Sequence, residues 1–155
     1  MNCDVSFLPN LSSGSWGFLI RDDEGDVFVT GRGKVDHLLN VFHAELVACL
    51  QGIQVAVDLG ISHLIVESYA KMVVQAVSTN DFDDSVVGLL VSEIKNLVSS
   101  CFLSFQCVFR SRECNQAAHE LAKLGLLCNQ GEEQIMSSIP EGVHVCVAND
   151  MLASE

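Results

Sequence analysis

Seven cysteines in 155 residues form the first group whose side chains could hold a metal ion, form disulfides or act as nucleophiles. They are Cys3, Cys49, Cys101, Cys107, Cys114, Cys128 and Cys146. No two of them are separated by two residues, so the spacing excludes zinc-ribbon and thioredoxin-like motifs. An odd number of cysteines in a chain without a secretory signal favours buried, reduced thiols in an intracellular protein.

Carboxylates are the second chemical group, and 20 Asp and Glu against 8 Lys and Arg give a formal net charge of −12. Sequence-independent affinity for nucleic acid comes mostly from Lys and Arg side chains that neutralise phosphates, so this net charge disfavours a strong non-specific nucleic-acid binder. It also disfavours an anionic membrane surface. No stretch free of Asp, Glu, Lys and Arg reaches the roughly 20 residues of a membrane-spanning helix. The first basic residue is Arg21, so we expect no signal peptide and an intracellular location, cytoplasmic or nuclear.

Hydrophobic periodicity predicts the elements that would position these carboxylates. Apolar or alternating runs bounded by turn residues predict five strands, at 1–8, 16–20, 27–30, 63–67 and 101–109. Apolar residues at helical spacing predict helices at 41–59, 68–77 and 86–98, and a last helix that follows residue 115. Asn40, Ser68 and Asn115 are the expected N-cap residues of the first, second and last helices.

This order of elements, β-β-β-α-β-α-α-β-α, indicates an α/β fold with a mixed sheet flanked by helices. We expect three antiparallel strands followed by two parallel ones, within a domain of residues 1–130. The tail after Gly131 has five acidic residues and no Lys or Arg. Residues 131–155 are therefore expected to be a loosely attached acidic extension.

Five short segments, each weak by itself, lie in a recognisable order. They are residues 2–7 (NCDVSF), 16–22 (WGFLIRD), 43–46 (HAEL), 64–68 (LIVES) and 112–122 (RECNQAAHELA). Together they resemble the plant RNase H-like family, the ribonuclease H domains related to those of retrotransposon reverse transcriptases. The resemblance covers residues 1–127, and the tail at 140–150 is similar to that of cereal members. It implies an RNase H-like fold with the element order described above.

Active members of that family cut RNA in an RNA–DNA hybrid, and the resemblance implies four carboxylates that hold two Mg²⁺ ions. Two hard cations about 3.5–4 Å apart need oxygen ligands, and they stabilise the attacking and the leaving oxygen. In this chain the first two positions are Asp4 and Glu45, which are the expected metal ligands. The third and fourth catalytic positions are Tyr69 and His119, each in place of an aspartate.

The two replacements alter the expected chemistry. A phenol with a pKa near 10 is neutral at pH 7, which makes Tyr69 a poor Mg²⁺ ligand. The imidazole of His119 suits Zn²⁺ or Mn²⁺ better than Mg²⁺. Glu67 shares the strand face of Tyr69 but is expected about 6–7 Å back along the strand, too far to replace the missing carboxylate. Tyr69 could instead stack on a nucleic-acid base.

Without the resemblance, each of these residues has an ordinary structural explanation. Asp4 is then a surface acid, and Glu45 is favoured by the helix dipole near the start of its helix. His119 is a histidine on a helix face, and Tyr69 is an aromatic residue at a strand end.

The sequence thus supports the hypothesis of an RNase H type-1-like domain of nucleic-acid-binding ancestry whose degenerate carboxylate site has weak or no hydrolytic activity. One alternative is an active RNA–DNA hybrid endoribonuclease with Mg²⁺ or Mn²⁺ as cofactor; otherwise no cofactor is expected. Another alternative is a non-catalytic protein-interaction module or a retrotransposon remnant. The implied partner is an RNA–DNA hybrid or another nucleic acid, which the net charge of −12 disfavours. No membrane partner is expected.

Overall fold

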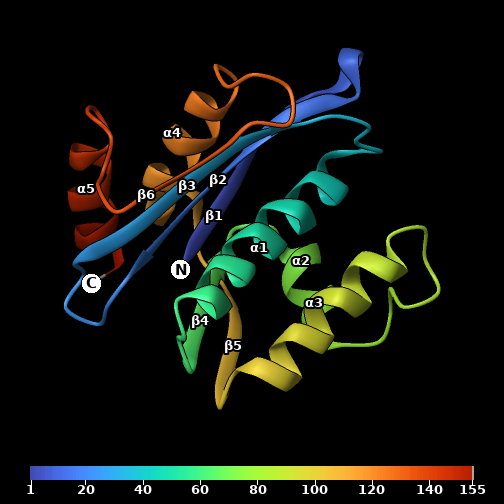
Figure 1. The fold of residues 1–155 in the computed structure, drawn as a ribbon. Helices are drawn as coiled ribbons and strands as arrows, with labels where there is room; N and C mark the ends of the chain where they lie inside the picture. Colours follow the sequence, from blue (N-terminus) through green and yellow to red (C-terminus); the bar gives the residue numbers. More distant parts are fainter. Residues whose placement is uncertain (155) are drawn as a thin grey trace.

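The computed structural model describes residues 1–154, which form a six-stranded mixed sheet with helices on both faces (Figure 1). The strands lie in the order β5-β4-β1-β2-β3-β6. They are β1 (Asn2–Leu8), β2 (Ser13–Arg21), β3 (Val27–Val35), β4 (His63–Ser68), β5 (Ser104–Phe109) and β6 (Glu133–Met136). Strands β1, β2, β3 and β6 pair antiparallel, whereas β4 pairs parallel with both β1 and β5. The predicted α/β class and mixed sheet are confirmed.

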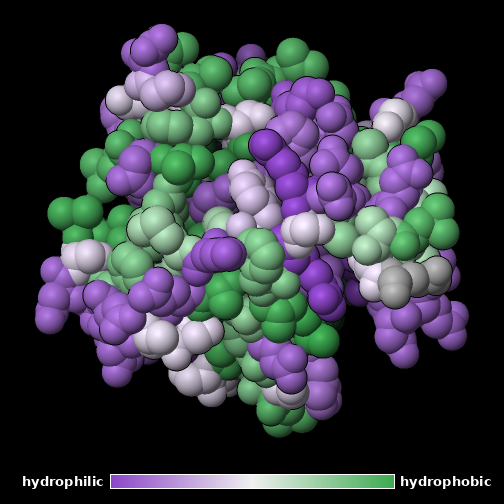
Figure 2. Space-filling view, turned by 180° about the vertical axis from the view of Figure 1, so that it is seen from behind, coloured by the Kyte–Doolittle hydropathy of each residue, from purple (hydrophilic) through white to green (hydrophobic). Residues whose placement is uncertain are grey.

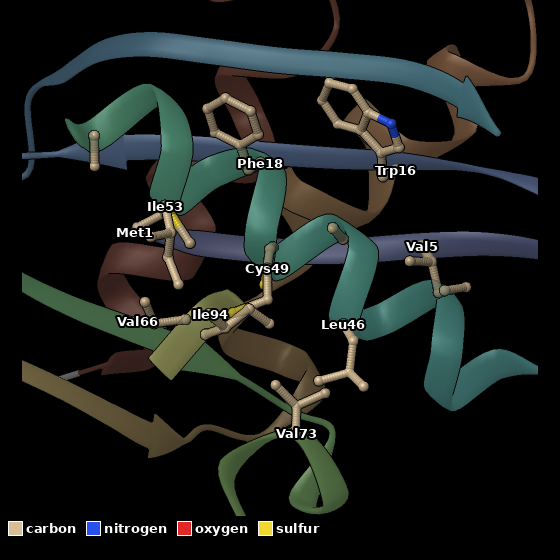
Figure 3. Packing of buried hydrophobic residues seen from close by; sticks show 14 of the residues in the cluster. Met1, Val5, Trp16, Phe18, Leu46, Cys49, Ile53, Val66, Val73 and Ile94 are labelled. Atoms are coloured by element: carbon tan, nitrogen blue, oxygen red, sulfur yellow. The ribbon is translucent and has the colours of Figure 1, made fainter. Parts of the chain in front are cut away.

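The helices divide between the two faces of the sheet. They are α1 (Val41–Asp58), α2 (Lys71–Ser78), α3 (Gly88–Cys101), α4 (Gln116–Gly125) and α5 (His144–Ser154), with 3-10 turns η1 (Pro9–Leu11) and η2 (Arg112–Cys114). One hydrophobic core lies between the sheet and α1, α2 and α3 (Figure 3). A second, smaller core lies under α4 and α5. Adjacent residues of β2 pack into different cores, because successive side chains of a strand point to opposite faces of the sheet. Phe18 lies in the larger core and Leu19 in the smaller one.

Helix α1 is the central element of the larger core, and it carries Glu45. The Asn40 side chain accepts a hydrogen bond from the backbone N–H of His43 at 2.9 Å, so the predicted N-cap is confirmed. By length and composition alone, α1 could cross a membrane. However, its buried face packs on β1, β2 and α3, and the core helix of such a sheet passes the same test.

Strands β2 and β3 are longer than their hydrophobic runs, because aromatic rings cover two glycines. Trp16 pairs with Gly33 and Phe18 pairs with Gly31 across the two strands. A Cβ at either glycine would collide with the opposing ring. The predicted strand at 27–30 therefore continues to Val35, since the glycines admit the rings that bury this part of the sheet.

The other face of the sheet is closed by α4, which lies directly against β2 (Figure 2 shows this side of the molecule, with a strongly hydrophilic band down its middle). At Gly17 the two backbones approach so closely that an added Cβ would collide with the backbone nitrogen of Ala122. The Ser15 hydroxyl donates a hydrogen bond to the carbonyl oxygen of the same Ala122. Because α4 also carries His119, Gly17 determines how close that histidine comes to the sheet.

Gly17→Ala is expected to lower the free energy of unfolding by about 1–3 kcal/mol, because the new methyl group must push α4 away from β2. Urea unfolding followed by circular dichroism measures this change. Ser92→Ala, on the exposed side of α3, is the control and should stay within about 0.5 kcal/mol of the parent. A Gly17→Ala protein as stable as the control would contradict the close approach of α4.

The prediction of five strands is wrong by one strand. Residues 133–136 form β6, which pairs antiparallel with β3 from Thr30 to Gly33. Four residues in a polar tail are too short for a hydrophobic pattern, and backbone pairing with an open sheet edge decides their structure. The tail is also not loosely attached, because Val143 and Val147 of its last part are buried against α4. The domain boundary after residue 130 stays a prediction.

Two of the predicted N-caps differ in the structure. Helix α2 begins at Lys71, and Ser68 is instead the buried last residue of β4, where its hydroxyl accepts a hydrogen bond from the Ala70 N–H. Asn115 stands at the N-cap position of α4, but its side chain makes no capping bond. Its amide nitrogen donates to the carbonyl oxygen of Cys3 at 2.9 Å instead. At Asn115 a long-range contact thus replaces the expected cap, whereas the Ser68 hydroxyl makes a local bond before α2 begins.

Candidate functional site

Asp4, in the middle of the sheet, is the centre of the candidate site. Its side chain is fully buried, with Oδ1 accepting a hydrogen bond from the Val5 N–H at 2.7 Å. Its other oxygen, Oδ2, lies 2.9 Å from Nδ1 of His119 in α4 and shares a hydrogen bond with it. Burial raises the pKa of Asp4, although the Val5 N–H and His119 act against this rise. Both oxygens are therefore already occupied by the protein itself.

Glu45 reaches the same site from α1. Burial raises its pKa to about 8, and the neighbouring Asp4 carboxylate adds to the effect, whereas the Tyr69 hydroxyl opposes it. A pKa one unit above pH 7 leaves roughly one carboxyl group in ten ionised. The Oε2 atom is buried without a hydrogen-bond partner among residues 1–154. Glu45 is thus mostly a neutral acid at pH 7.

Tyr69 directly follows the last residue of β4 and lies close to Asp4 and Glu45. The parallel pairing of β1 with β4, with Asn2 opposite Glu67, brings the end of β4 to this part of β1. Burial raises the pKa of the Tyr69 hydroxyl, and the carboxyl groups of Glu45 and Asp4 raise it further. The phenol is therefore neutral, and it occupies the position at which the resemblance implies a carboxylate.

The structure brings all four sequence-predicted positions, Asp4, Glu45, Tyr69 and His119, into one site, and adds a cation that the sequence analysis had not assigned. The guanidinium carbon of Arg112 in η2 lies 5.4 Å from the centre of the Tyr69 ring. Its positive charge lowers the pKa values of Asp4, Glu45 and Tyr69 in opposition to burial. The one sequence feature that could have pointed to Arg112 is its place in the segment RECNQAAHELA, three residues before Asn115.

Asn115 and Asp150 were also missed as residues that position the site. Asn115 is buried, and its hydrogen bond to Cys3 ties the start of α4 to the residue before Asp4. Asp150 of α5 accepts hydrogen bonds from the N–H groups of Gln116 at 2.8 Å and Ala117 at 2.9 Å. It therefore caps α4 from a distant part of the chain, and nothing in the sequence pattern indicates such a pairing.

Glu67 does not contribute its carboxylate to the site. Its Oε1 accepts a hydrogen bond from Nε of Arg110 at 3.0 Å, and its Oε2 accepts from Nδ2 of Asn2 at 3.0 Å and Nη2 of Arg21 at 3.3 Å. Burial raises the pKa of Glu67, but the hydrogen bonds from Arg110 and Asn2 and the charge of Arg21 outweigh burial, so the net pKa is lowered. Glu67 is therefore the anionic centre of a separate ion-pair network.

Glu67→Gln is expected to remove a pH-dependent part of the stability. Because folding lowers the pKa of Glu67 below its ordinary value, its contribution is fully present above about pH 4.5 and is lost as the pH falls through the lowered value. The difference in unfolding free energy between wild type and Glu67→Gln should therefore be largest near neutral pH and shrink in acid. Urea unfolding at a series of pH values measures it, with the exposed Glu113→Gln as control. A difference that is constant with pH would contradict the ion-pair network.

These residues do not fit a pair of Mg²⁺ ions. Asp4 uses both oxygens within the protein, and Tyr69 is a neutral phenol that supplies no carboxylate. Within residues 1–154, no group of three or more His, Cys, Asp or Glu side chains is arranged to hold a metal ion. Mg²⁺ prefers near-octahedral oxygen coordination, which this set of donors does not supply. The site therefore contains neutral and hydrogen-bonded groups where two Mg²⁺ ions would need four carboxylate ligands.

Comparisons with known proteins agree with the fold. The family model described as "Reverse transcriptase-like" matches residues 2–125. RNase H1 from the halophilic archaeon Halobacterium salinarum NRC-1 superimposes with a TM-score of 0.71 at 19% identity, covering 81% of this chain and 94% of that protein. The N-terminal RNase H domain of Rv2228c from Mycobacterium tuberculosis, solved as a fusion with maltose binding protein, gives 0.72 at 20% identity, covering 80% and 89%.

A third solved structure was determined with a nucleic acid. LC11-RNase H1 in complex with an RNA/DNA hybrid superimposes with a TM-score of 0.71 at 16% identity, covering 79% of this chain and 92% of that one. No curated protein matches the sequence of this chain. At these identities the similarity to solved structures establishes the RNase H-like fold.

Proposed function

We propose a function from one premise: this chain belongs to the reverse transcriptase-like family, whose model matches residues 2–125. The domain binds nucleic acid, with an RNA–DNA hybrid as the reference ligand, and has weak or no hydrolytic activity. The hybrid bound by one of the structural neighbours supports the choice of ligand. An origin in plant retrotransposon-derived proteins, as the sequence motifs indicate, is part of the same proposal.

One observation carries the proposed loss of hydrolysis: both oxygens of Asp4 are already hydrogen-bonded within the protein. His119 is hydrogen-bonded to Asp4, and the Tyr69 hydroxyl lies beside Glu45. To bind a metal ion through Oδ2, Asp4 must give up its hydrogen bond to His119. Tyr69 offers no anionic oxygen in exchange, because burial keeps its phenol neutral. Both features oppose the binding of Mg²⁺ at Asp4 and Glu45.

In this proposal, Asp4 and Glu45 line a site that once held metal ions, and Tyr69 and His119 occupy the other two positions. Arg112 adds one positive charge beside the carboxyl groups, but its guanidinium cannot act as a metal ligand. The fold and the surface that faces a nucleic acid are kept, while the cleavage chemistry is lost.

Two measurements test the proposal. Fluorescence anisotropy with a labelled RNA–DNA hybrid should detect binding that weakens as salt rises. A cleavage assay on the same hybrid with Mg²⁺, and then with Mn²⁺, should show no turnover above the background. Mg²⁺-dependent turnover that Asp4→Asn abolishes would overturn the proposed loss of hydrolysis and favour an active endoribonuclease. Failure to bind nucleic acid would overturn the proposed ligand.

A further inference from the structure

The carboxyl ends of the parallel strands β4 and β5 meet beside the candidate site. Ser68 pairs with Phe109, the last residue of β5, and the backbone N–H of Arg110 donates to the carbonyl oxygen of Ser68 at 2.9 Å. The segments that leave these two ends carry Tyr69 and Lys71 on one side and Arg110 and Arg112 on the other. We call these four residues and Phe109 the β4–β5 edge surface.

The β4–β5 edge surface contains two pairs in which a cation lies over an aromatic ring. Lys71 Nζ lies 5.2 Å from the centre of the Phe109 ring, and the guanidinium carbon of Arg112 lies 5.4 Å from the centre of the Tyr69 ring. Phe109 is 46% exposed, although phenylalanine is normally a core residue. Each pair joins residues from both strand ends, so the fold rather than one local motif assembles them.

The positive charge of this surface is unusual for the chain. The protein has only eight Lys and Arg residues, and three of them lie here. Arg110 is neutralised by its ion pair with Glu67, whereas no salt bridge within residues 1–154 involves Lys71 or Arg112. Two cations outside any such salt bridge, next to two aromatic rings, thus lie beside the site in a protein with a net charge of −12.

We propose that the β4–β5 edge surface binds single-stranded nucleic acid, with unpaired bases against Tyr69 and Phe109 and backbone phosphates near Lys71 and Arg112. Aromatic and guanidinium planes stack on bases, and such stacking requires bases that are not paired within a duplex. The inference rests on the proposed function, because it names the form of nucleic acid that the same domain prefers.

Two features favour a single strand over a hybrid duplex. A duplex presents mainly phosphates, and its binding needs a row of cations along its length, which two unpaired basic residues do not supply. A single strand offers base faces to the rings and needs few phosphate contacts. The small positive charge and the exposed aromatic ring of Phe109 therefore match a flexible strand of unpaired bases.

The test uses fluorescein-labelled RNA and DNA oligonucleotides of one sequence, compared with the RNA–DNA hybrid of that sequence. We expect tighter binding of at least one single strand than of the hybrid. Phe109→Ala should weaken single-strand binding at least about fivefold, the effect of losing one stacked base. Lys71→Ala should reduce the slope of log affinity against log salt by about 0.7, the value for one phosphate contact. Phe28→Ala, which removes a ring that is 43% exposed elsewhere on the surface, and Lys123→Ala are the matched controls.

A second measurement needs no substitution. Tyr69 is the single tyrosine of the chain, so one ring label gives NMR signals that need no further assignment. Stacking of a base on Tyr69 should shift these signals as a single strand is added.

Equal weakening by the control variants, or unshifted Tyr69 signals in a protein that is saturated with oligonucleotide, would overturn the inference. Binding of the hybrid without binding of either single strand would overturn it while leaving the proposed function intact. Binding of none of the three ligands would overturn both.

Discussion

Tyr69→Asp combined with His119→Asp is expected to raise the affinity for Mg²⁺ at least about tenfold, a change of about 1.4 kcal/mol in binding free energy. The first substitution places a carboxylate directly after β4, beside Asp4 and Glu45. The second releases Asp4 Oδ2 from its hydrogen bond with His119 and adds oxygen ligands of the kind that Mg²⁺ prefers. Titration with Mg²⁺, followed by NMR signals of residues near Asp4 and Glu45, measures the affinity.

The stability of the doubly substituted protein should also depend on Mg²⁺. Four carboxyl groups in one site repel each other without a metal ion, and a ligand that binds only the folded state stabilises it. A Mg²⁺ concentration about 100-fold above the dissociation constant should add about 2.7 kcal/mol to the unfolding free energy.

The matched control is Tyr69→Asn with His119→Asn. Asn side chains have nearly the same shape as Asp side chains but carry no charge. It should bind Mg²⁺ no better than the wild type. If the doubly substituted Asp protein folds and still binds no more Mg²⁺ than this control, then the geometry of the site is lost together with its ligands. That result would reject the replaced side chains as the sole cause of weak metal binding.

Asp150→Ala is expected to lower the free energy of unfolding by about 2–4 kcal/mol. Asp150 is 2% exposed, and its two oxygens accept the N–H groups of Gln116 and Ala117. Removal of the carboxylate leaves two donors at the start of α4 without a partner, and each unsatisfied buried group costs about 1–3 kcal/mol. Thermal unfolding should show a loss of about 4 °C or more, and the amide hydrogens of Gln116 and Ala117 should exchange faster.

Two further variants separate the cap from the charge. Asp150→Asn keeps one acceptor oxygen and should destabilise the protein less than Asp150→Ala. Asp84→Ala removes an exposed carboxylate from the loop before α3 and should change stability by less than about 0.5 kcal/mol. Equal stability of Asp150→Ala and Asp84→Ala would show that α5 does not hold α4 in solution.

The sequence by itself determined the order of the strands and helices up to α4. Hydrophobic spacing is a local property, so the run of apolar residues in α1 and the Asn40 cap are readable from neighbours in the chain. The five ordered segments likewise identified Asp4, Glu45, Tyr69 and His119 as one group of positions, which the structure brings together. The expectation that Tyr69 and His119 stand in place of two aspartates also comes from the sequence alone, because it depends on residue type.

Only the tertiary structure decided how those positions interact. Asp4 and His119 are 115 residues apart, and their hydrogen bond exists because the close approach at Gly17 lets α4 lie against the sheet. The Asp150 cap, strand β6 and the position of Arg112 over Tyr69 depend in the same way on segments that are distant in the chain. Periodicity carries no information about such contacts, since they are decided by which surfaces the folded backbone brings within hydrogen-bonding distance.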